Sequence, residues 1–178
     1  MNKFLGMFIL LLLSSSCSSN LDFNQVNNLK LTPIVVANFA TFDVPANQFL
    51  IGGVEQSVTG DVLNFDIFRN SFFNKSLIKA DLYFEINNTI NRAYIINLYF
   101  LDVNNSPLYR INFNVPAYNG VVNLVTKPVP FENNNIALLK NTWKIGFTVT
   151  MLPGTALNNG SLGSLKLSSS ATAYLVIQ

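Results

Sequence analysis

The sequence predicts an all-β fold, an antiparallel β-sandwich of the Ig-like kind, with a small closed β-barrel as the alternative. Apolar and polar residues alternate with a period of two from Leu31 onward, which is typical of antiparallel strands with one buried and one solvated face. Turn-forming residues separate the alternating runs. Only residues 71–78 and 134–140 could be helical, so the chain lacks the long crossovers that parallel strands require.

The strands can be placed from these runs and turns. Turns are expected at Gly52-Gly53, Asn87-Asn88, Asn104 to Pro107, Asn119-Gly120, Pro153-Gly154 and Asn158 to Gly160. Strands are expected, in chain order, at residues 33–38, 48–52, 54–59, 61–68, 81–87, 94–103, 108–115, 121–126, 143–151 and 163–177. Strands of a sandwich and of a small barrel both alternate, so periodicity does not separate these two folds.

Three runs alternate most cleanly. The expected inward residues are Leu82, Phe84 and Ile86 in the first, Tyr109, Ile111, Phe113 and Val115 in the second, and Trp143, Ile145, Phe147, Val149 and Met151 in the third. Trp143 is therefore expected in the core. The final strand runs almost to Gln178, and it could be either an unpaired edge that recruits a partner strand or a central strand.

The N-terminal residues have the layout of a secretory signal. Lys3 precedes a ten-residue apolar run, Phe4 to Leu13, and three serines then lead to Cys17, the single cysteine of the chain. Ten residues are too few to span the roughly 30 Å hydrocarbon core of a bilayer as a helix. We therefore expect a signal peptide at residues 1–16, an Asn- and Ser-rich tether at 17–30 and one β-sandwich domain at 31–178.

A cysteine directly after small residues resembles the bacterial lipobox, in which the thiol is acylated and becomes the mature N-terminus. The usual lipobox has Leu where this chain has Ser14. The signal is similar to the looser signals of Bacteroidota-type lipoproteins, as is the content of 26 Asn. The resemblance implies a lipid on Cys17 and membrane attachment through it. Asp does not follow Cys17, and no acidic cluster follows it either, which favours the periplasmic face of the outer membrane.

Composition argues against several classes of function. The formal net charge is +2 and the charges are scattered singly, so nucleic-acid binding, which needs clustered Lys and Arg, is not expected. The chain has no histidine, which removes Ser-His-Asp triads and His-bearing zinc sites. Asp81 and Glu85 would lie about 13 Å apart along one strand, beyond either glycosidase geometry. We therefore expect no enzyme activity, no cofactor and no metal.

Aromatic residues are the enriched class with binding potential, with 15 Phe, six Tyr and one Trp. Phe72 and Phe73 could form an exposed apolar contact surface or a plug that closes one end of the sandwich. Tyr83 and Tyr99, together with Tyr94 and Tyr109, would form an aromatic strip if they shared one outward face. Tyr109 counts against such a strip, because it falls on the apolar side of its strand.

These observations give three functional hypotheses in order of preference. The first is a non-enzymatic lipoprotein of the outer membrane that binds another envelope protein. The second is a carrier of a lipid or other apolar ligand, which needs a cavity of several hundred Å3. The third is a carbohydrate-binding module or carbohydrate-active enzyme. The sequence does not identify a partner or a small-molecule ligand.

Overall fold

The computed structural model describes residues 29–65, 67 and 70–177. The chain divides into one unit of Met1–Leu31 with Gln178 and a second unit of Thr32–Ile177. The second unit holds every strand and helix considered below. Cys17, the expected signal peptide and most of the expected tether lie outside the described residues.

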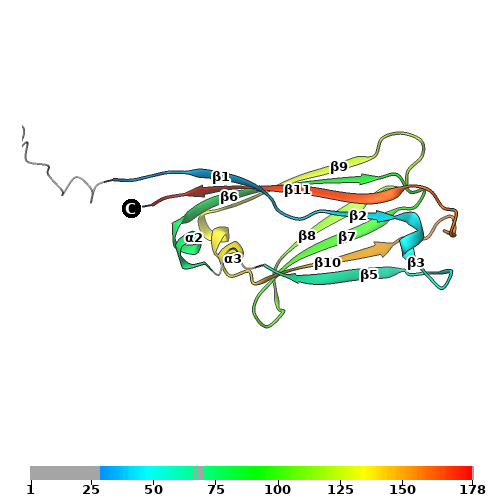
Figure 1. The fold of residues 1–178 in the computed structure, drawn as a ribbon, viewed down its shortest axis with the longest axis horizontal. Helices are drawn as coiled ribbons and strands as arrows, with labels where there is room; N and C mark the ends of the chain where they lie inside the picture. Colours follow the sequence, from blue (N-terminus) through cyan, green and yellow to red (C-terminus); the bar gives the residue numbers. More distant parts are fainter. Residues whose placement is uncertain (1–28, 66, 68–69, 178) are drawn as a thin grey trace, which may run out of the picture. The chain divides into compact units, whose positions relative to one another are not determined.

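The first sheet follows the order β1-β11-β6-β9, with β2 also paired to β11 (Figure 1). Its strands are β1 (Ile34–Asn38), β2 (Phe42–Pro45), β6 (Leu77–Asn88), β9 (Leu124–Glu132) and β11 (Ser164–Leu175). All pairings are antiparallel. β1 and β2 lie one after the other along the same side of β11, so together they form one edge of this sheet.

The second sheet follows the order β5-β10-β7-β8 and is also antiparallel. Its strands are β5 (Val58–Asn64), β7 (Tyr94–Leu101), β8 (Pro107–Val115) and β10 (Lys144–Met151). The remaining elements are a small hairpin of β3 (Leu50–Ile51) and β4 (Val54–Glu55), the 3-10 helices η2 (Ala46–Phe49) and η4 (Asn133–Asn135), and the short helices α2 (Ser71–Ser76) and α3 (Ile136–Lys140).

The predicted antiparallel sandwich is confirmed, and the two sheets do not close into a barrel. If the edge formed by β1 and β2 counts as one strand, each sheet has four strands, in the orders β1/β2-β11-β6-β9 and β5-β10-β7-β8. This is the order of an eight-stranded jelly roll, whereas Ig domains arrange their strands as ABED and CFG. Helices form at 71–76 and 136–140, within the two expected stretches.

Several element boundaries differ from the predictions. The strand expected at 121–126 is β9, which runs from Leu124 to Glu132 and contains Pro128 and Pro130. Proline removes a donor from the ladder. β9 tolerates these two prolines because, among the strands that the structure describes, it is an edge strand paired only with β6. The last strand, β11, is central and not an edge. Trp143 is 38% exposed, so its expected core position is wrong.

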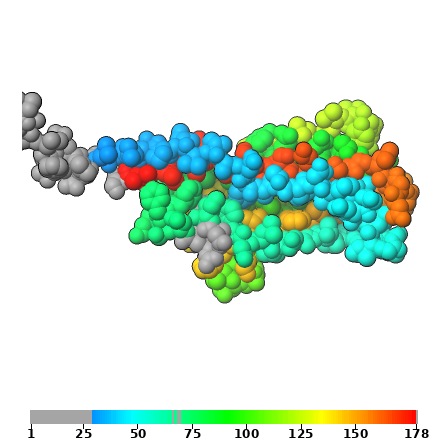
Figure 2. Space-filling view, in the orientation of Figure 1, coloured from blue at the N-terminus to red at the C-terminus, as the bar shows by residue number. Residues whose placement is uncertain are grey.

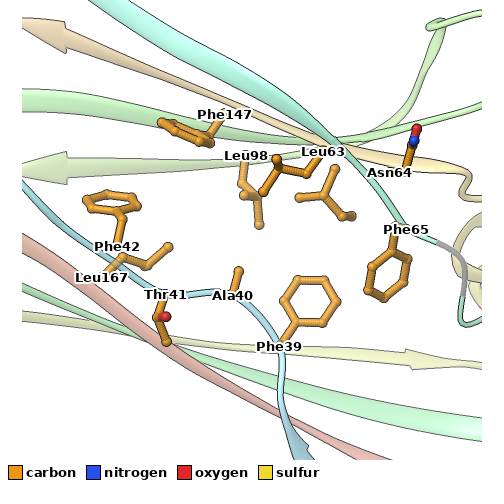
Figure 3. Close-up of a pocket in the computed structure, with 11 residues that line it drawn as sticks. Phe39, Ala40, Thr41, Phe42, Leu63, Asn64, Phe65, Leu98, Phe147 and Leu167 are labelled. Atoms are coloured by element: carbon orange, nitrogen blue, oxygen red, sulfur yellow. The ribbon is translucent and has the colours of Figure 1, made fainter.

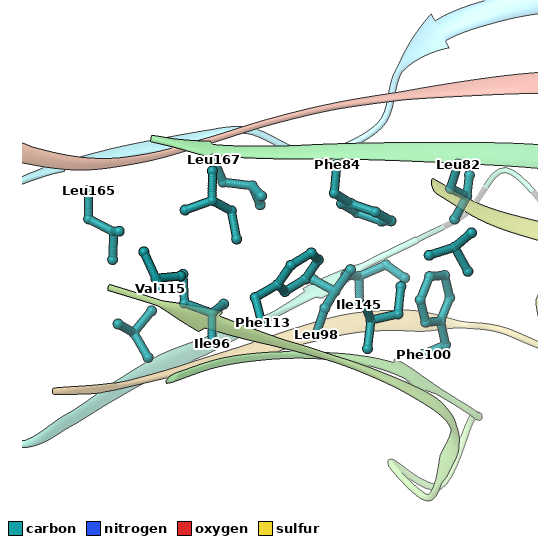
Figure 4. Packing of buried hydrophobic residues seen from close by; sticks show 14 of the residues in the cluster. Leu82, Phe84, Ile96, Leu98, Phe100, Phe113, Val115, Ile145, Leu165 and Leu167 are labelled. Atoms are coloured by element: carbon teal, nitrogen blue, oxygen red, sulfur yellow. The ribbon is translucent and has the colours of Figure 1, made fainter. Parts of the chain in front are cut away.

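The core fills the space between the two sheets (Figure 4). The predicted alternation in β6 is confirmed, since Leu82, Phe84 and Ile86 are at most 2% exposed. The ring of Phe84 lies 5.7 Å from that of Phe113 on β8, so the two sheets meet through aromatic contacts. Burying one such side chain contributes about 1.5–3 kcal/mol, and the core is large enough to hold the domain without a disulfide.

Buried polar residues tie the loops together at the end of the sandwich near β3, on the right in Figure 1. Arg92 is 6% exposed. Its guanidinium donates to the backbone oxygens of Leu152 and Thr155 and pairs with Glu55 at 3.1 Å. Asn88, which is fully buried, donates to the backbone oxygens of Arg92 and Pro116. These contacts join four separate segments of the chain.

Tyr94 lies beside this polar cluster and is fully buried. Its ring packs on Phe49 with 5.1 Å between ring centroids, and its hydroxyl has no hydrogen-bond partner among the described residues. Burial raises the pKa of Tyr94 far above its ordinary value of 10.0, and this outweighs the lowering effect of nearby Arg92. Tyr94 is therefore a neutral core residue and not a titrating surface group.

Candidate functional site: an apolar groove at the open side of the sandwich

The two long sides of the sandwich differ. On one side β8 and β9 contact each other. There, Lys127 on β9 donates to the backbone oxygen of Asn112 on β8 at 3.1 Å and lies over the ring of Phe113. On the other side, β2 and β5 leave an apolar pocket between them. In Figure 2 gold atoms of the β10 region are visible between the cyan atoms of β2 and the blue-green atoms of β5.

The pocket exists because the edge of the first sheet is broken. β1 ends at Asn38 and β2 begins at Phe42, and the break is fastened by Ser169 of β11. The Ser169 hydroxyl donates to the backbone oxygen of Ala40 at 2.6 Å and accepts from the Ala40 N–H at 2.8 Å. Ser169 shares the inward face of β11 with the apolar Leu167 and Ala171, which are two residues away on either side. A polar residue therefore occupies a core position, and its hydroxyl holds the backbone at the break.

The main pocket has a volume of about 290 Å3. Phe39 and Phe42 line it from the first sheet, and Leu63, Phe65 and Phe147 line it from the second (Figure 3). The rings of Phe42 and Phe147 stack at 5.6 Å and close one end. The volume is near the lower end of the range of about 300–1,000 Å3 for small-molecule sites. It therefore suits a few apolar side chains better than a whole lipid.

A smaller pocket of about 140 Å3 continues the groove toward α2 and α3. Phe39 and Phe65 line both pockets, and their rings meet edge to face at 5.2 Å. Ala37, Phe73 and Leu139 contribute to the smaller pocket. We call the two pockets together the apolar groove, with the Phe39–Phe65 pair as its internal partition.

β5 forms one wall of the groove and is exposed at all seven residues. Residues directly opposite one another in an antiparallel pair point to the same face. Thr59, Asp61 and Leu63 lie opposite the inward-facing Val149, Phe147 and Ile145, so they also face inward. Leu63 is nevertheless 59% exposed. The inner face of β5 is therefore not covered by the opposite sheet.

Charge is sparse at the groove. The side chains that line both pockets include no Asp, Glu, Lys or Arg, so the groove is suited to an uncharged apolar group. Asp61 is the charged residue of β5, and its carboxylate accepts the N–H of Val62 at 2.7 Å. No group of three or more His, Cys, Asp or Glu side chains within the described ranges could hold a metal ion.

The structure separates the site residues expected from sequence. Phe72 in α2 is 53% exposed, whereas its neighbour Phe73 is partly buried against the core and lines the smaller pocket. Each of the two proposals for this pair thus applies to one residue, since Phe73 closes the interior and Phe72 remains on the surface. α2 begins there because the Asn70 side chain accepts the N–H groups of Phe72 and Phe73.

The four tyrosines do not share one face. Tyr83 is 43% exposed on the outer face of the first sheet, beside a shallow polar depression that Glu85 and Ser168 also line. Tyr99 alternates with buried Leu98 and Phe100, so it lies on the outer face of the second sheet. Tyr94 is buried. Tyr109 packs inward against Phe131, with 5.2 Å between ring centroids.

Nearby on the outer face of the first sheet, Lys79 pairs with Asp81 at 3.3 Å and with Glu132 at 3.7 Å. The hydrogen bond to Asp81 raises the pKa of Lys79. Such exposed pairs contribute little to stability.

Of the residues that form the groove, sequence reasoning singled out Phe73 and expected Phe147 to face inward, but it did not identify Phe39 or Leu63 as part of a site. Phe39 lies in the break between two strands and Phe65 lies just after β5, so neither belongs to a clean alternation. One signal was available: apolar residues lie on both faces of β5, with Val58 and Val62 on one face and Leu63 on the other. That pattern points to an uncovered surface only once the strand is known to be an edge, and the strand order that decides this is not contained in the sequence pattern.

The described residues include no helix that is both long enough and apolar enough to cross a membrane.

Comparison with known proteins gives no family. No family model matches the chain, and no curated protein matches it. Among solved structures, the VP2 subviral particle of infectious bursal disease virus is similar over 80% of this chain and 32% of its own, with 13% identity and a TM-score of 0.41. A candidate secreted protein from Parabacteroides distasonis is similar over 65% of this chain and 37% of its own, with 17% identity and a TM-score of 0.42. This chain thus spans about a third of each, and likenesses this weak carry no information about function.

Replacing Ser169 with alanine should loosen the break that shapes the groove. Both hydrogen bonds to Ala40 are lost, and the expected cost is about 1–2 kcal/mol of unfolding free energy. Hydrogen–deuterium exchange should show faster exchange at Phe39 and Ala40 with little change in β6. The control is Ser168→Ala on the outer face of the same strand, which should leave exchange in both segments unchanged. Equal effects of the two variants would contradict the role given to Ser169.

Proposed function

We propose that the protein is a lipid-anchored, non-enzymatic binding component of the cell envelope. In this proposal a lipid on Cys17 holds the chain at the periplasmic face of the outer membrane, and the β-sandwich contacts another envelope protein there. The observation that carries the binding role is the uncharged apolar groove of about 290 Å3 at the open side of the sandwich. The lipobox-like signal around Cys17 supports the location.

The size and chemistry of the groove support a protein partner. Large contiguous patches of exposed apolar surface are rare on monomeric soluble proteins, and they commonly mark interaction sites. Leu63 is 59% exposed and Val62 is 50% exposed, and both belong to an edge strand next to the groove. A partner that covers these residues would remove apolar area from water at about 25 cal/mol per Å2.

The test is chemical cross-linking of the lipid-anchored protein in native membranes, followed by mass spectrometry. We expect a dominant protein partner that disappears in the Cys17→Ala variant. The same variant should lose incorporation of labelled palmitate and leave the membrane fraction. If no partner recurs in the wild-type protein, or if the same partner is captured without the anchor, the proposal fails.

The groove also favours one alternative, a carrier of an apolar ligand, because its lining is apolar and includes no charged side chain. The neutral fluorescent probe N-phenyl-1-naphthylamine separates the two functions. A carrier should bind it in the groove, and Ala40→Phe, which fills the pocket, should abolish that binding. Absence of saturable binding would remove the carrier hypothesis.

A further inference from the structure

The free edge of β5 offers unpaired backbone groups beside the groove. In the part of the chain that the structure describes, β5 pairs only with β10. Phe65 donates its N–H to the Trp143 oxygen, and the Ser57 oxygen accepts from Met151. Odd-numbered residues of β5 therefore bond toward β10, since direction alternates along a strand. The N–H and C=O groups of Val58, Gly60, Val62 and Asn64 consequently point to the free edge.

One of these donors already has a hydrogen-bond partner in the neighbouring residue of β5. The Val62 N–H bonds the Asp61 carboxylate at 2.7 Å. An incoming strand would replace that contact with a backbone carbonyl and leave the Asp61 carboxylate facing inward without it. A basic side chain on the incoming strand, placed opposite Asp61, would then restore a partner for this charge.

Charge also argues against a second copy of this chain as the occupant. A full antiparallel pairing of β5 with itself, residues 58–64 against 58–64, places Asp61 opposite Asp61. Like charges directly opposite each other are destabilising, and an inward-pointing charge on an edge strand disfavours pairing with any strand that does not neutralise it. A lipid fits less well than a strand because it would leave the backbone groups of the free edge without partners.

We propose that β5 binds an extended segment of a partner protein by strand addition, with an apolar side chain opposite Leu63 and a Lys or Arg opposite Asp61. This proposal rests on the proposed function and specifies its partner. The two positions are two residues apart on β5, so both partner side chains face inward. The apolar side chain enters the main pocket between Phe39, Phe65 and Leu63, while main-chain hydrogen bonds hold the strand.

The test uses a displayed library of random seven-residue peptides against the full chain carrying Cys17→Ala. Enriched peptides should share a Lys or Arg two positions from a Val, Ile, Leu or Phe and should lack proline in between. Asp61→Lys should change the preferred charge to Asp or Glu. Val62→Pro should weaken the binding of the selected peptides by about tenfold, because it removes a hydrogen-bond donor from the free edge. This variant should keep its pairing with β10, since the alternation along β5 directs the Val62 N–H away from that strand.

Thermal unfolding checks that each variant is folded, and Val62→Thr, which retains the N–H, is the matched control. The proposal is overturned if the selected peptides share no consensus. It is also overturned if Asp61→Lys leaves their preferred charge unchanged and Val62→Pro leaves their affinity unchanged. It is also overturned if sedimentation shows a dimer that Val62→Pro dissociates, which would make a second copy the occupant. If the library fails while membrane cross-linking still captures an anchored partner, strand addition is wrong and the proposed function stands.

Discussion

Replacing Arg92 with methionine is expected to lower the free energy of unfolding by about 3–5 kcal/mol, the range for removing one partner of a buried ion pair. Methionine retains much of the apolar stem but none of the donors. Glu55 would lose its cationic partner at 3.1 Å and keep only the Leu157 N–H, and the backbone oxygens of Leu152 and Thr155 would lose their donor. In a domain of this size, the melting temperature should fall by about 10 °C.

Arg110→Met is the matched control, because Arg110 is exposed on the edge strand β8 and its loss should cost no more than about 0.5 kcal/mol. Adding Glu55→Gln to Arg92→Met should recover part of the stability, since the carboxylate left without its partner becomes neutral. The account of this cluster is wrong if Arg92→Met and Arg110→Met have the same melting temperature.

Gly163→Ala is expected to destabilise the domain by at least about 3 kcal/mol, because strain and a steric clash coincide. Gly163 has φ +96°, and an added Cβ would lie 2.2 Å from the backbone oxygen of Thr89. The contact cannot relax easily. Thr89 and Ser164 are joined by hydrogen bonds on both sides, including Thr89 N–H to the Ser164 oxygen at 2.9 Å, and Ala46 donates to the Gly163 oxygen at 3.0 Å.

Two other glycines separate the causes of this loss. Gly120 has a similar φ of +95° with nothing within 4 Å of an added Cβ, so Gly120→Ala should show the cost of backbone strain alone, about 1 kcal/mol. Gly160, in the same loop as Gly163, meets only the flexible Asn158 side chain, so Gly160→Ala should cost little. Denaturant unfolding of the three variants measures the loss of unfolding free energy in each. If Gly163→Ala lost no more than Gly120→Ala, the proposed steric clash would be refuted.

The fold could be predicted because its signal is local. Alternation depends on one buried and one solvated face. β6 from Ala80 onward and β8 from Arg110 onward follow it, whereas β10 departs from it at the buried Gly146 and the half-buried Phe147. The extent of β9 could not be predicted, because Pro128 and Pro130 are tolerated only where a strand has a free edge. Edge or central position depends on strand order, which period-two patterns do not contain.

The groove could not be predicted for a related reason. It depends on a pairing across 129 residues, in which Ser169 fastens Ala40, and on the side-by-side placement of β2 and β5 in different sheets. The sequence pointed to Phe72 and Phe73 as an aromatic pair, but only Phe73 lines the smaller pocket. The tyrosines failed as a group because strands in opposite sheets carry Tyr83 and Tyr99.

The central claim is that the open side between β2 and β5 is where the anchored protein meets its partner. The most direct measurement is photo-cross-linking in native membranes, with p-benzoyl-phenylalanine placed at Leu63 or, as a control, at Val103 in the turn between β7 and β8. Both positions are more than half exposed, at 59% and 52%. We predict a discrete cross-linked partner from position 63 that is absent from position 103 and lost with Cys17→Ala. Equal cross-linking from both positions, or none from position 63, would contradict the account.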